Sequence, residues 1–237
     1  MSEEPILHCH ELTKRFLAGD GVLAVDNVDL AVRRGEFVVI TGASGSGKTT
    51  LLNLLGGIDR PTYGEVILDD RKYSRLSENA LARLRRTKLG FVFQFFNLLS
   101  DLTAEENVSL PMRLCRLSEQ AISDRAQMLL EEVGMLGRAS HSPFELSGGE
   151  QQRIAIARAL ANNPSVVLAD EPTGNLDSRN ARAIIDLFRR FNKEKGQTFV
   201  VVSHDQHVAT AADRVVTLVD GGIAGIVEGP AGGGAPC

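Results

Sequence analysis

The stretch GASGSGKT at residues 42–49 constrains the fold of this 237-residue chain more than any other feature. It fits the pattern Gly-x-x-x-x-Gly-Lys-Ser/Thr. It lies between FVVIT, which reads as a buried strand, and TLLNLL, which reads as a helix. Glycines let backbone N–H groups turn inward, and the N-terminus of a helix adds partial positive charge. Chance produces the bare pattern, but the strand before it and the helix after it predict a phosphate-binding loop.

The lysine and the threonine that end this pattern have distinct expected roles. Lys48 should reach the β- and γ-phosphates of a nucleotide, and the Thr49 hydroxyl should bind Mg²⁺. We expect nucleotide contacts along the whole loop, from Gly42, Ala43, Ser44, Gly45, Ser46, Gly47, Lys48, Thr49 and Thr50.

Two acidic residues end a second apolar run, VVLADE at residues 166–171. In phosphate-loop enzymes an aspartate in this position holds Mg²⁺ through water, which predicts a metal role for Asp170. Glu171 would orient or deprotonate the attacking water. Taken alone, the pair would more often be two acids at the mouth of a loop, capping the helix that we expect to begin near Ser178. Beside a phosphate loop, the catalytic interpretation is favoured.

Composition and charge exclude several classes of protein. Hydrophobic residues make up 43% and charged residues 24%, which is typical of a globular chain. The net charge of −4 has the wrong sign for a chain that coats nucleic acid, so we expect no direct nucleic-acid binding. No apolar run approaches the ~20 residues that span a bilayer. The acidic start carries no secretory signal pattern, and three cysteines are too few for a disulfide framework. These features predict a cytoplasmic protein.

Strand and helix patterns alternate along most of the chain. Runs at residues 37–42, 89–94, 165–171 and 198–204 read as strands, with Gln94 and His204 at the ends of the second and fourth, and residues 178–195 read as a helix. This alternation predicts a mostly parallel sheet covered on both faces. Between about residues 95 and 161 the helical spacing dominates, with Thr103 and Ser118 as candidate N-caps. That block is most simply an insertion.

The stretch LSGGEQ at residues 146–151, followed by RIAIARAL, narrows the choice of protein family. A serine–glycine helix cap alone is common, but six consecutive matches in this order are not. The chain closely resembles the ATP-binding subunits of ABC transporters from about residue 6 to residue 227. Within that family it looks most like the ATPases of lipoprotein release, macrolide export and cell division. The stretches FQFFNLLSDLTAEENVSLP and VLADEPTGNLD carry this closer likeness.

The resemblance implies a fold class and its domain boundaries. We expect an α/β phosphate-loop NTPase (RecA-like) core with an N-terminal antiparallel β subdomain and an inserted helical subdomain. Residues 1–228 would form a single ABC ATPase domain. The core and β subdomain would comprise residues 1–94 and 162–228, the helical subdomain residues 95–161, and residues 229–237 a flexible tail.

The resemblance also implies that neither ATP site is complete within one chain. Free N–H groups and a hydroxyl at the start of a helix can bind a γ-phosphate. In the family this motif contacts the ATP held by the other subunit, so two ATP molecules are enclosed in a head-to-tail homodimer. The residues implied here are Ser147, Gly148, Gly149, Glu150 and, in the D-loop GNLD, Asp177.

Three further positions follow from the resemblance. Gln94 would be the Q-loop glutamine, which touches Mg²⁺ and relays contact with the membrane partner. His204 would be the switch histidine that contacts the γ-phosphate, although a lone histidine at a strand end is more often a hydrogen-bonded core residue. Phe16 stands where the family places an aromatic ring that stacks on adenine, usually a tyrosine. The expected catalytic set is Glu171, His204, Lys48 and Gln94, and the expected metal set is Thr49, Gln94 and Asp170.

Two apolar or metal-like patterns stay open. Phe95, Phe96, Leu98 and Leu99 could belong to the core of the helical block or to an apolar groove for a partner's helix. His8 and His10 share one face of a strand while Cys9 points away, so metal binding there is disfavoured.

The sequence therefore predicts an ATP-hydrolysing subunit that uses ATP and Mg²⁺, forms a homodimer with ATP, and powers a transporter or force-transmitting complex. Integral membrane permeases, on separate chains, would hold it at the inner face of the membrane. One alternative is a soluble ABC ATPase for cofactor assembly, and another is a nucleotide-gated switch that does not hydrolyse. Glu171 and His204 count against the switch.

Overall fold

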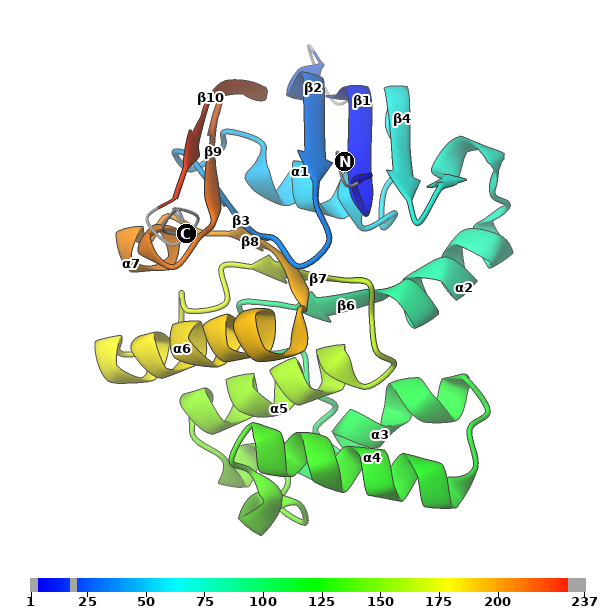
Figure 1. Ribbon diagram of the computed structural model, residues 1–237, viewed down its shortest axis with the longest axis vertical. Helices are drawn as coiled ribbons and strands as arrows, with labels where there is room; N and C mark the ends of the chain where they lie inside the picture. Colours follow the sequence, from blue (N-terminus) through cyan, green and yellow to red (C-terminus); the bar gives the residue numbers. More distant parts are fainter. Residues whose placement is uncertain (1–3, 18–20, 230–237) are drawn as a thin grey trace, which may run out of the picture.

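Two β-sheets, packed with helices, make up the part of the chain that the structure describes (Figure 1). The computed structural model describes residues 4–17 and 21–229. The larger sheet has the strand order β10-β9-β3-β8-β7-β6, and the smaller has the order β2-β1-β4-β5. This arrangement confirms the predicted α/β core with an antiparallel β subdomain.

The larger sheet is parallel except at one edge. Its strands are β3 (Phe37–Thr41), β6 (Leu89–Val92), β7 (Val166–Asp170), β8 (Thr198–Val202), β9 (Arg214–Val219) and β10 (Gly222–Glu228). Only β10 runs antiparallel, beside β9, among the strands described in this sheet. The sequence interpretation did not include β10.

The central strands are buried on both faces because their apolar residues alternate between two cores. In β3, Phe37 and Val39 belong to the core shared with the long helices, whereas Val38 and Ile40 face the antiparallel sheet and α1 (Lys48–Leu55). All four side chains are fully buried. A strand enclosed in this way has little freedom, so its carboxyl end is a firm support for the loop that follows.

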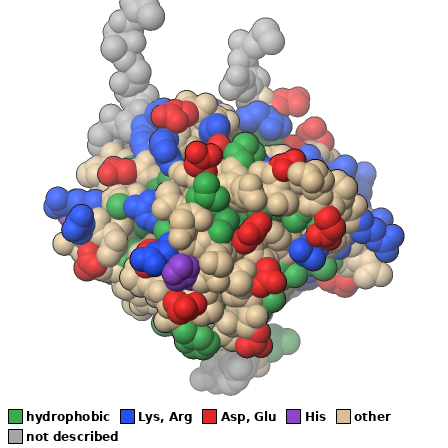
Figure 2. Space-filling view, turned by 90° about the horizontal axis from the view of Figure 1, so that it is seen from below, with side chains coloured by type: hydrophobic (Ala, Val, Ile, Leu, Met, Phe, Trp, Pro, Cys, Tyr) green, Lys and Arg blue, Asp and Glu red, His purple; other side chains and the backbone are tan. Residues whose placement is uncertain are grey.

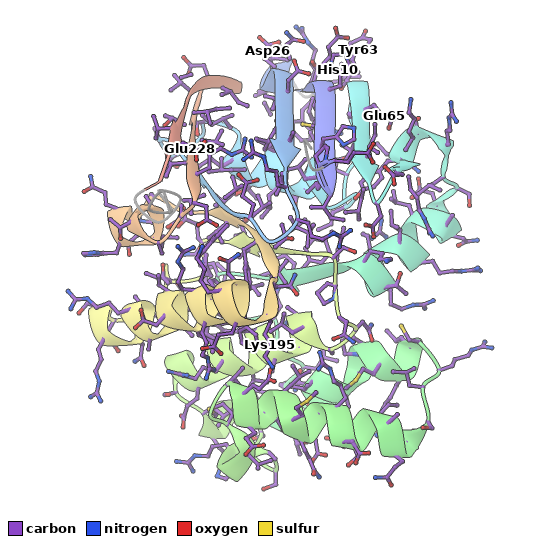
Figure 3. All side chains as sticks on the ribbon, viewed as in Figure 1. His10, Asp26, Tyr63, Glu65, Lys195 and Glu228 are labelled. Atoms are coloured by element: carbon purple, nitrogen blue, oxygen red, sulfur yellow. The ribbon has the colours of Figure 1, made fainter. Side chains whose placement is uncertain are left out.

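The smaller sheet lies against one face of the larger one (Figure 1). Its strands are β1 (Leu7–Phe16), β2 (Val22–Val32), β4 (Tyr63–Leu68) and β5 (Arg71–Lys72). Figure 3 shows the labelled His10, Asp26 and Tyr63 at the end of this sheet that is farthest from the long helices. The β1–β2 hairpin therefore extends away from the helical part of the molecule.

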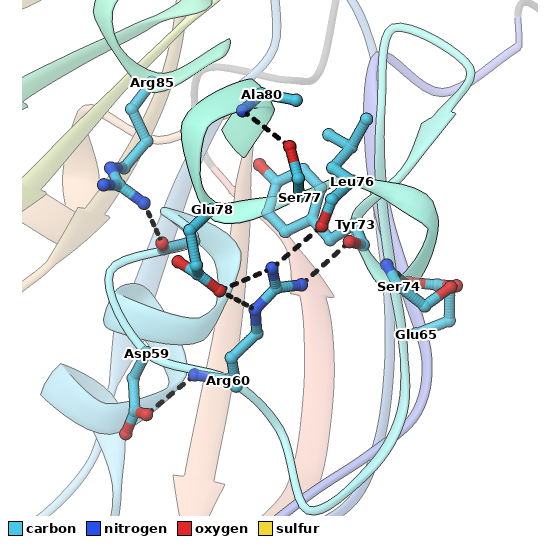
Figure 4. Close-up of polar contacts among 11 residues, drawn as sticks. Asp59, Arg60, Glu65, Tyr73, Ser74, Leu76, Ser77, Glu78, Ala80 and Arg85 are labelled. Carbon is cyan, nitrogen blue, oxygen red and sulfur yellow. Dashed lines mark hydrogen bonds and ion pairs between the residues drawn. The ribbon is translucent and has the colours of Figure 1, made fainter. Parts of the chain in front are cut away.

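A hydrogen-bonded turn joins this sheet to α2 (Glu78–Lys88) through the short helix η1 (Tyr73–Arg75). The Arg60 guanidinium donates to the carbonyl oxygens of Tyr73 and Leu76, at 2.8 and 3.0 Å, and pairs with Glu78 at 2.8 Å (Figure 4). One side chain thus fixes the start of α2, where Ser77 is the N-cap.

The helical block covers the other face of the parallel sheet. It contains α3 (Ala104–Leu114), α4 (Glu119–Glu132), η2 (Leu136–Arg138), η3 (Pro143–Glu145) and α5 (Gly148–Leu160). Thr103 and Ser118 are N-caps, as the sequence predicted. Seen from this side, acidic and basic side chains are interspersed with small apolar patches (Figure 2). The division of the chain at residues 95 and 161 stays a prediction.

Two helices complete the structure. The helix α6 (Ser178–Lys195) has the bounds that its sequence predicted, and α7 (Gln206–Thr210) follows β8. No helix among residues 4–17 and 21–229 is long and apolar enough to cross a membrane. The expected flexible tail lies outside the described residues, apart from Gly229.

Candidate functional site

The phosphate loop follows β3 and packs tightly between two other strands. Gly42 has a φ of 152°, and a Cβ there would lie 2.3 Å from the carbonyl oxygen of Leu218. Gly47 has a φ of 98°, and a Cβ there would lie 2.0 Å from the carbonyl oxygen of Ala24. Only glycine can occupy these two positions without displacing backbone. The loop is therefore held in place by β2 and β9.

The N-terminus of α1 offers unpaired donors to an anion. Its N-cap is Gly47, which supplies no side-chain hydrogen bond to the first amides. Lys48 is buried, and its Nζ donates to the carbonyl oxygens of Gly42 and Ala43 at 2.9 and 2.7 Å. The Ser46 hydroxyl is buried without a hydrogen-bond partner. A phosphate group would satisfy these donors, as the sequence predicted.

The end of β7 brings a carboxylate to the first turn of α1. The Thr49 hydroxyl donates to Asp170 Oδ1 at 3.2 Å. Burial raises the pKa of Asp170, and the neighbouring Glu171 carboxylate adds to this, although the Thr49 hydrogen bond opposes it. A divalent cation would stabilise a carboxylate in such a position, and oxygen ligands suit Mg²⁺. These two residues therefore fit a magnesium ion.

Glu171 begins the turn after β7 with left-handed backbone geometry, at a φ of 44°. Its N–H donates to the Val202 carbonyl oxygen at 2.9 Å, which ties it to the neighbouring strand β8. Its carboxylate Oε2 lies 2.9 Å from His204 Nδ1. The His204 side chain is 72% exposed, so the alternative of a core histidine is wrong.

These groups line one cleft of about 630 Å³, a volume that suits a small-molecule ligand. Most of the phosphate loop, Gln94, Glu171 and His204 line it. So do Val22, Leu23 and Ala24 at the start of β2, which the sequence interpretation missed. Their signal was weak, because partial alternation in a strand does not show what its end will face.

Phe16 lies at the rim of the cleft. It ends β1 and pairs with Val22 in the antiparallel ladder, but its own ring is not among the residues that line the cleft. The ring is 41% exposed, and Lys14 Nζ lies 5.0 Å from its centroid. An aromatic face in this position is accessible for stacking on a flat ligand.

The stretch LSGGEQ at residues 146–151, the signature motif, lies outside this cleft. Ser147 caps α5 in a capping box: its hydroxyl and amide donate to Glu150 Oε2, both at 2.8 Å. Hydrogen bonds from Ser147 lower the pKa of Glu150. None of Ser147, Gly148, Gly149 and Glu150 lines the cleft. This placement agrees with a motif that serves the site of another subunit.

The D-loop adjoins the signature helix within the chain. A Cβ on Gly149 would lie 2.6 Å from Asn180 Oδ1, so the starts of α5 and α6 are in close contact. Asp177 caps α6, and it accepts from the amide of Asn180 at 2.9 Å. The two motifs therefore form one continuous surface.

Gln94 lies two residues beyond the end of β6, not within the strand as its sequence suggested. The strand is short because hydrogen bonding to β7 stops at Val92, which pairs with Ala169. Likewise β8 ends at Val202, two residues before His204. Both side chains therefore belong to loops at the carboxyl edge of the sheet, where sites in α/β folds lie.

The two open patterns of the sequence, around Cys9 and around Phe95, have the following surroundings. Cys9 is buried, its Sγ lies 3.5 Å from the Val28 carbonyl oxygen, and burial raises its pKa to about 12. The described residues contain no group of three or more metal-binding side chains. Phe95 is 73% exposed, whereas Leu98 packs against the core.

The comparisons with known proteins agree with this geometry. The profile of the family described as "ABC transporter" matches residues 25–174. Over 201 residues the chain is 52% identical to the lipoprotein-releasing system ATP-binding protein LolD 1 of Chlorobium chlorochromatii (strain CaD3). The match covers 84% of this chain and 82% of the relative.

Solved structures show the same fold. A dimeric structure of the ATP-binding cassette MJ0796, in a post-hydrolysis state bound to ADP and Pi, matches with a TM-score of 0.86 at 44% identity. It covers 94% of this chain and 98% of that one. The structure of cbiO1 from Clostridium perfringens, part of the ABC transporter complex cbiONQ, has a TM-score of 0.86 at 29% identity, over 95% of this chain and 89% of that one. The chain therefore belongs to the ABC transporter family, as an ATP-binding and ATP-hydrolysing subunit.

Proposed function

We propose that two copies of this chain enclose two ATP molecules and drive a membrane permease of the lipoprotein-release type. The observation that carries this proposal is the meeting of the phosphate loop, Glu171 and His204 in one cleft, with the signature helix outside it. Such a chain carries the residues for hydrolysis, and the signature motif of its partner copy would complete the ATP site.

The reaction would be attack of water on the γ-phosphate. Glu171 accepts the proton of the attacking water, and His204, 2.9 Å from its carboxylate, positions that carboxylate and donates toward the γ-phosphate. Lys48 leaves its loop carbonyls to bind the β- and γ-phosphates, where it balances the charge that develops on them.

Thr49, Asp170 and Gln94 would hold Mg²⁺. The ion supplies positive charge to the β- and γ-phosphate oxygens when it is bound. Asp170 is well suited to this role, because burial leaves its carboxylate short of solvation. Phe16 would stack on the adenine ring at the rim of the cleft.

The signature surface would bind the ATP of the second copy. The amides at the start of α5 and the Ser147 hydroxyl would contact its γ-phosphate, while Asp177 approaches from the D-loop. ATP then joins the two copies, and hydrolysis to ADP and phosphate releases them.

An apolar groove supports docking of the permease. It encloses about 620 Å³ between α2, β6, α3 and α5. Its apolar wall includes Ile58, Phe91 and Leu114, and Arg85 and Arg86 supply basic groups. An amphipathic helix of a partner fits a groove of this kind. Neither Phe95 nor Phe96 lines it.

Lipoprotein release is the favoured cargo class because the 52% identical relative carries that name. Export of macrolides or peptides is the second candidate within the same group of ATPases. In either case the permease would hold the chain at the cytoplasmic face of the membrane.

Affinity purification of the tagged chain from its native membranes in mild detergent tests this proposal. A multi-spanning protein in fixed ratio to the chain is the expected result. Leu114→Glu, in the groove, should abolish the association, whereas the matched control Val227→Glu, on the exposed edge strand β10, should retain it. Recovery of soluble proteins alone would contradict the proposal and favour a soluble assembly ATPase.

A further inference from the structure

A pair of side-chain amides joins the Q-loop to the D-loop within one chain. Gln94 Nε2 donates to Asn175 Oδ1 at 3.2 Å, and Asn175 Nδ2 donates to the backbone oxygen of Gln94 at 3.0 Å. The two residues are 81 positions apart in the sequence. The contact therefore belongs to the fold and not to a local turn.

The chemistry of this pair fixes which way each amide points. A backbone carbonyl can only accept, so Asn175 must turn its NH₂ group toward Gln94. The Asn175 oxygen then faces the Gln94 side chain, and because that oxygen also only accepts, Gln94 must offer its NH₂ group in return. The oxygen of the Gln94 amide is left for the cleft that this residue lines.

The neighbouring glycine shapes the same contact. A Cβ on Gly174 would lie 3.0 Å from Gln94 Nε2 and 3.3 Å from its Cδ. Gly174 also donates its N–H to the Glu171 oxygen at 3.0 Å, so the turn that carries Asn175 begins at the proposed catalytic base. The Gln94 amide is thus packed against one turn and oriented by it.

We propose that Asn175 is a positioning residue that presents the carbonyl oxygen of Gln94, and not its NH₂ group, to the metal ion of the nucleotide site. This inference rests on the proposed metal role of Gln94. An amide rotated by 180° would point hydrogens at a cation, so the orientation decides whether Gln94 can serve as a ligand at all. Groups that orient metal ligands typically contribute about 10- to 100-fold in metal affinity.

Mn²⁺ affinity tests the proposal without relying on hydrolysis. Protein in excess over a non-hydrolysable ATP analogue is titrated with Mn²⁺, and electron paramagnetic resonance measures the free ion. We expect Asn175→Ala to weaken Mn²⁺ binding about 10-fold, and Gly174→Ala to act in the same direction by displacing the Gln94 amide. Asn180→Ala, which removes a hydrogen bond to Asp177 in the same loop, is the matched control and should leave Mn²⁺ affinity unchanged.

A double-mutant cycle separates positioning from general damage to the loop. Adding Asn175→Ala to Gln94→Ala should cause no further loss of Mn²⁺ affinity, because the group being oriented is gone. Additive losses would overturn the proposal, as would normal Mn²⁺ binding by Asn175→Ala beside weak binding by Gln94→Ala. Normal binding by Gln94→Ala itself would refute the metal role of Gln94 under the proposed function, and the inference with it.

Discussion

The phosphate loop and the signature motif both present the start of a helix, yet their surroundings differ. The loop lies in a cleft with Glu171 and His204, each held by a buried strand that ends beside it. The signature serine instead closes a capping box with Glu150 and lines no part of that cleft. The start of α1 therefore shares a cleft with the proposed catalytic residues. The start of α5 offers its own amide and hydroxyl donors and lies outside that cleft.

This difference supports the proposal that the chain is one half of a two-chain site. Under the proposed function, buried strands fix the half that binds and hydrolyses ATP, and the helical block presents the half that would recognise ATP in another copy. Substitutions in the first half should therefore remove binding or chemistry, whereas those in the second should remove association alone.

Lys48→Ala should give the largest effect on the phosphate-loop half. Removal of the buried ammonium group should abolish measurable ATP binding, because the phosphates lose their principal charge partner. Isothermal titration of ATP into the variant measures this, with Lys72→Ala on the exposed strand β5 as the control. Unchanged ATP affinity would refute the assignment of the loop.

Glu171→Gln should separate binding from chemistry within that same half. Loss of the proposed base should lower the rate of hydrolysis by at least about 100-fold while ATP affinity is retained. ATP should then hold the variant as a stable dimer, which light scattering detects. Glu131→Gln, on the exposed face of α4, serves as the control. A variant that hydrolyses ATP at close to the normal rate would contradict the role of Glu171.

Asp213→Asn should lower the stability of the fold without changing either half of the site. Asp213 accepts from the Phe37 amide and pairs with Arg189 and Lys193, at 3.0, 3.0 and 3.2 Å. Loss of these charge-assisted contacts should lower the free energy of unfolding by about 2 kcal/mol. Urea denaturation measures this, and ATP affinity at low urea should not change.

The effect of Asp213→Asn should also depend on pH. Burial alone would raise the pKa of Asp213, but the Phe37 amide and the two cations outweigh it and hold the pKa below its usual range. Because the folded-state pKa lies below the unfolded value, the carboxylate stabilises the fold above about pH 4 and stops doing so as the pH falls through the folded value. The difference in the free energy of unfolding between the native protein and Asp213→Asn should therefore be constant from pH 7 to about 5. It should narrow below about pH 4. A difference that widens in acid would contradict this sign.

The sequence indicated which residues meet in the cleft better than it predicted the edges of elements. The phosphate loop and the signature are short, contiguous motifs, so their residues could be assigned without knowledge of tertiary contacts. The bounds of α6 were predicted because Asp177 caps it and its apolar face is regular. The ends of β6 and β8 were placed two residues too late, because the sequence does not show where hydrogen bonding to the neighbouring strands stops.

Other features depended on contacts between distant residues. The edge strand β10 is mostly exposed and rich in glycine, so it lacks the alternation that marks a half-buried strand. The β2 residues meet the phosphate loop where Ala24 approaches Gly47, which is a contact between residues distant in the sequence. The pairing of Asn175 with Gln94 likewise arises from the fold alone.

The state of association of Ser147 variants with ATP tests the two-halves account most directly. In a Glu171→Gln background, Ser147→Asp keeps a good helix cap but adds a carboxylate where the second copy's γ-phosphate would approach, and Ser147→Asn keeps the cap without the charge. Light scattering and ATP titration should find Ser147→Asp monomeric with normal ATP affinity, and Ser147→Asn dimeric. Loss of ATP affinity in monomeric Ser147→Asp, or an ATP-bound dimer of that variant, would contradict the account.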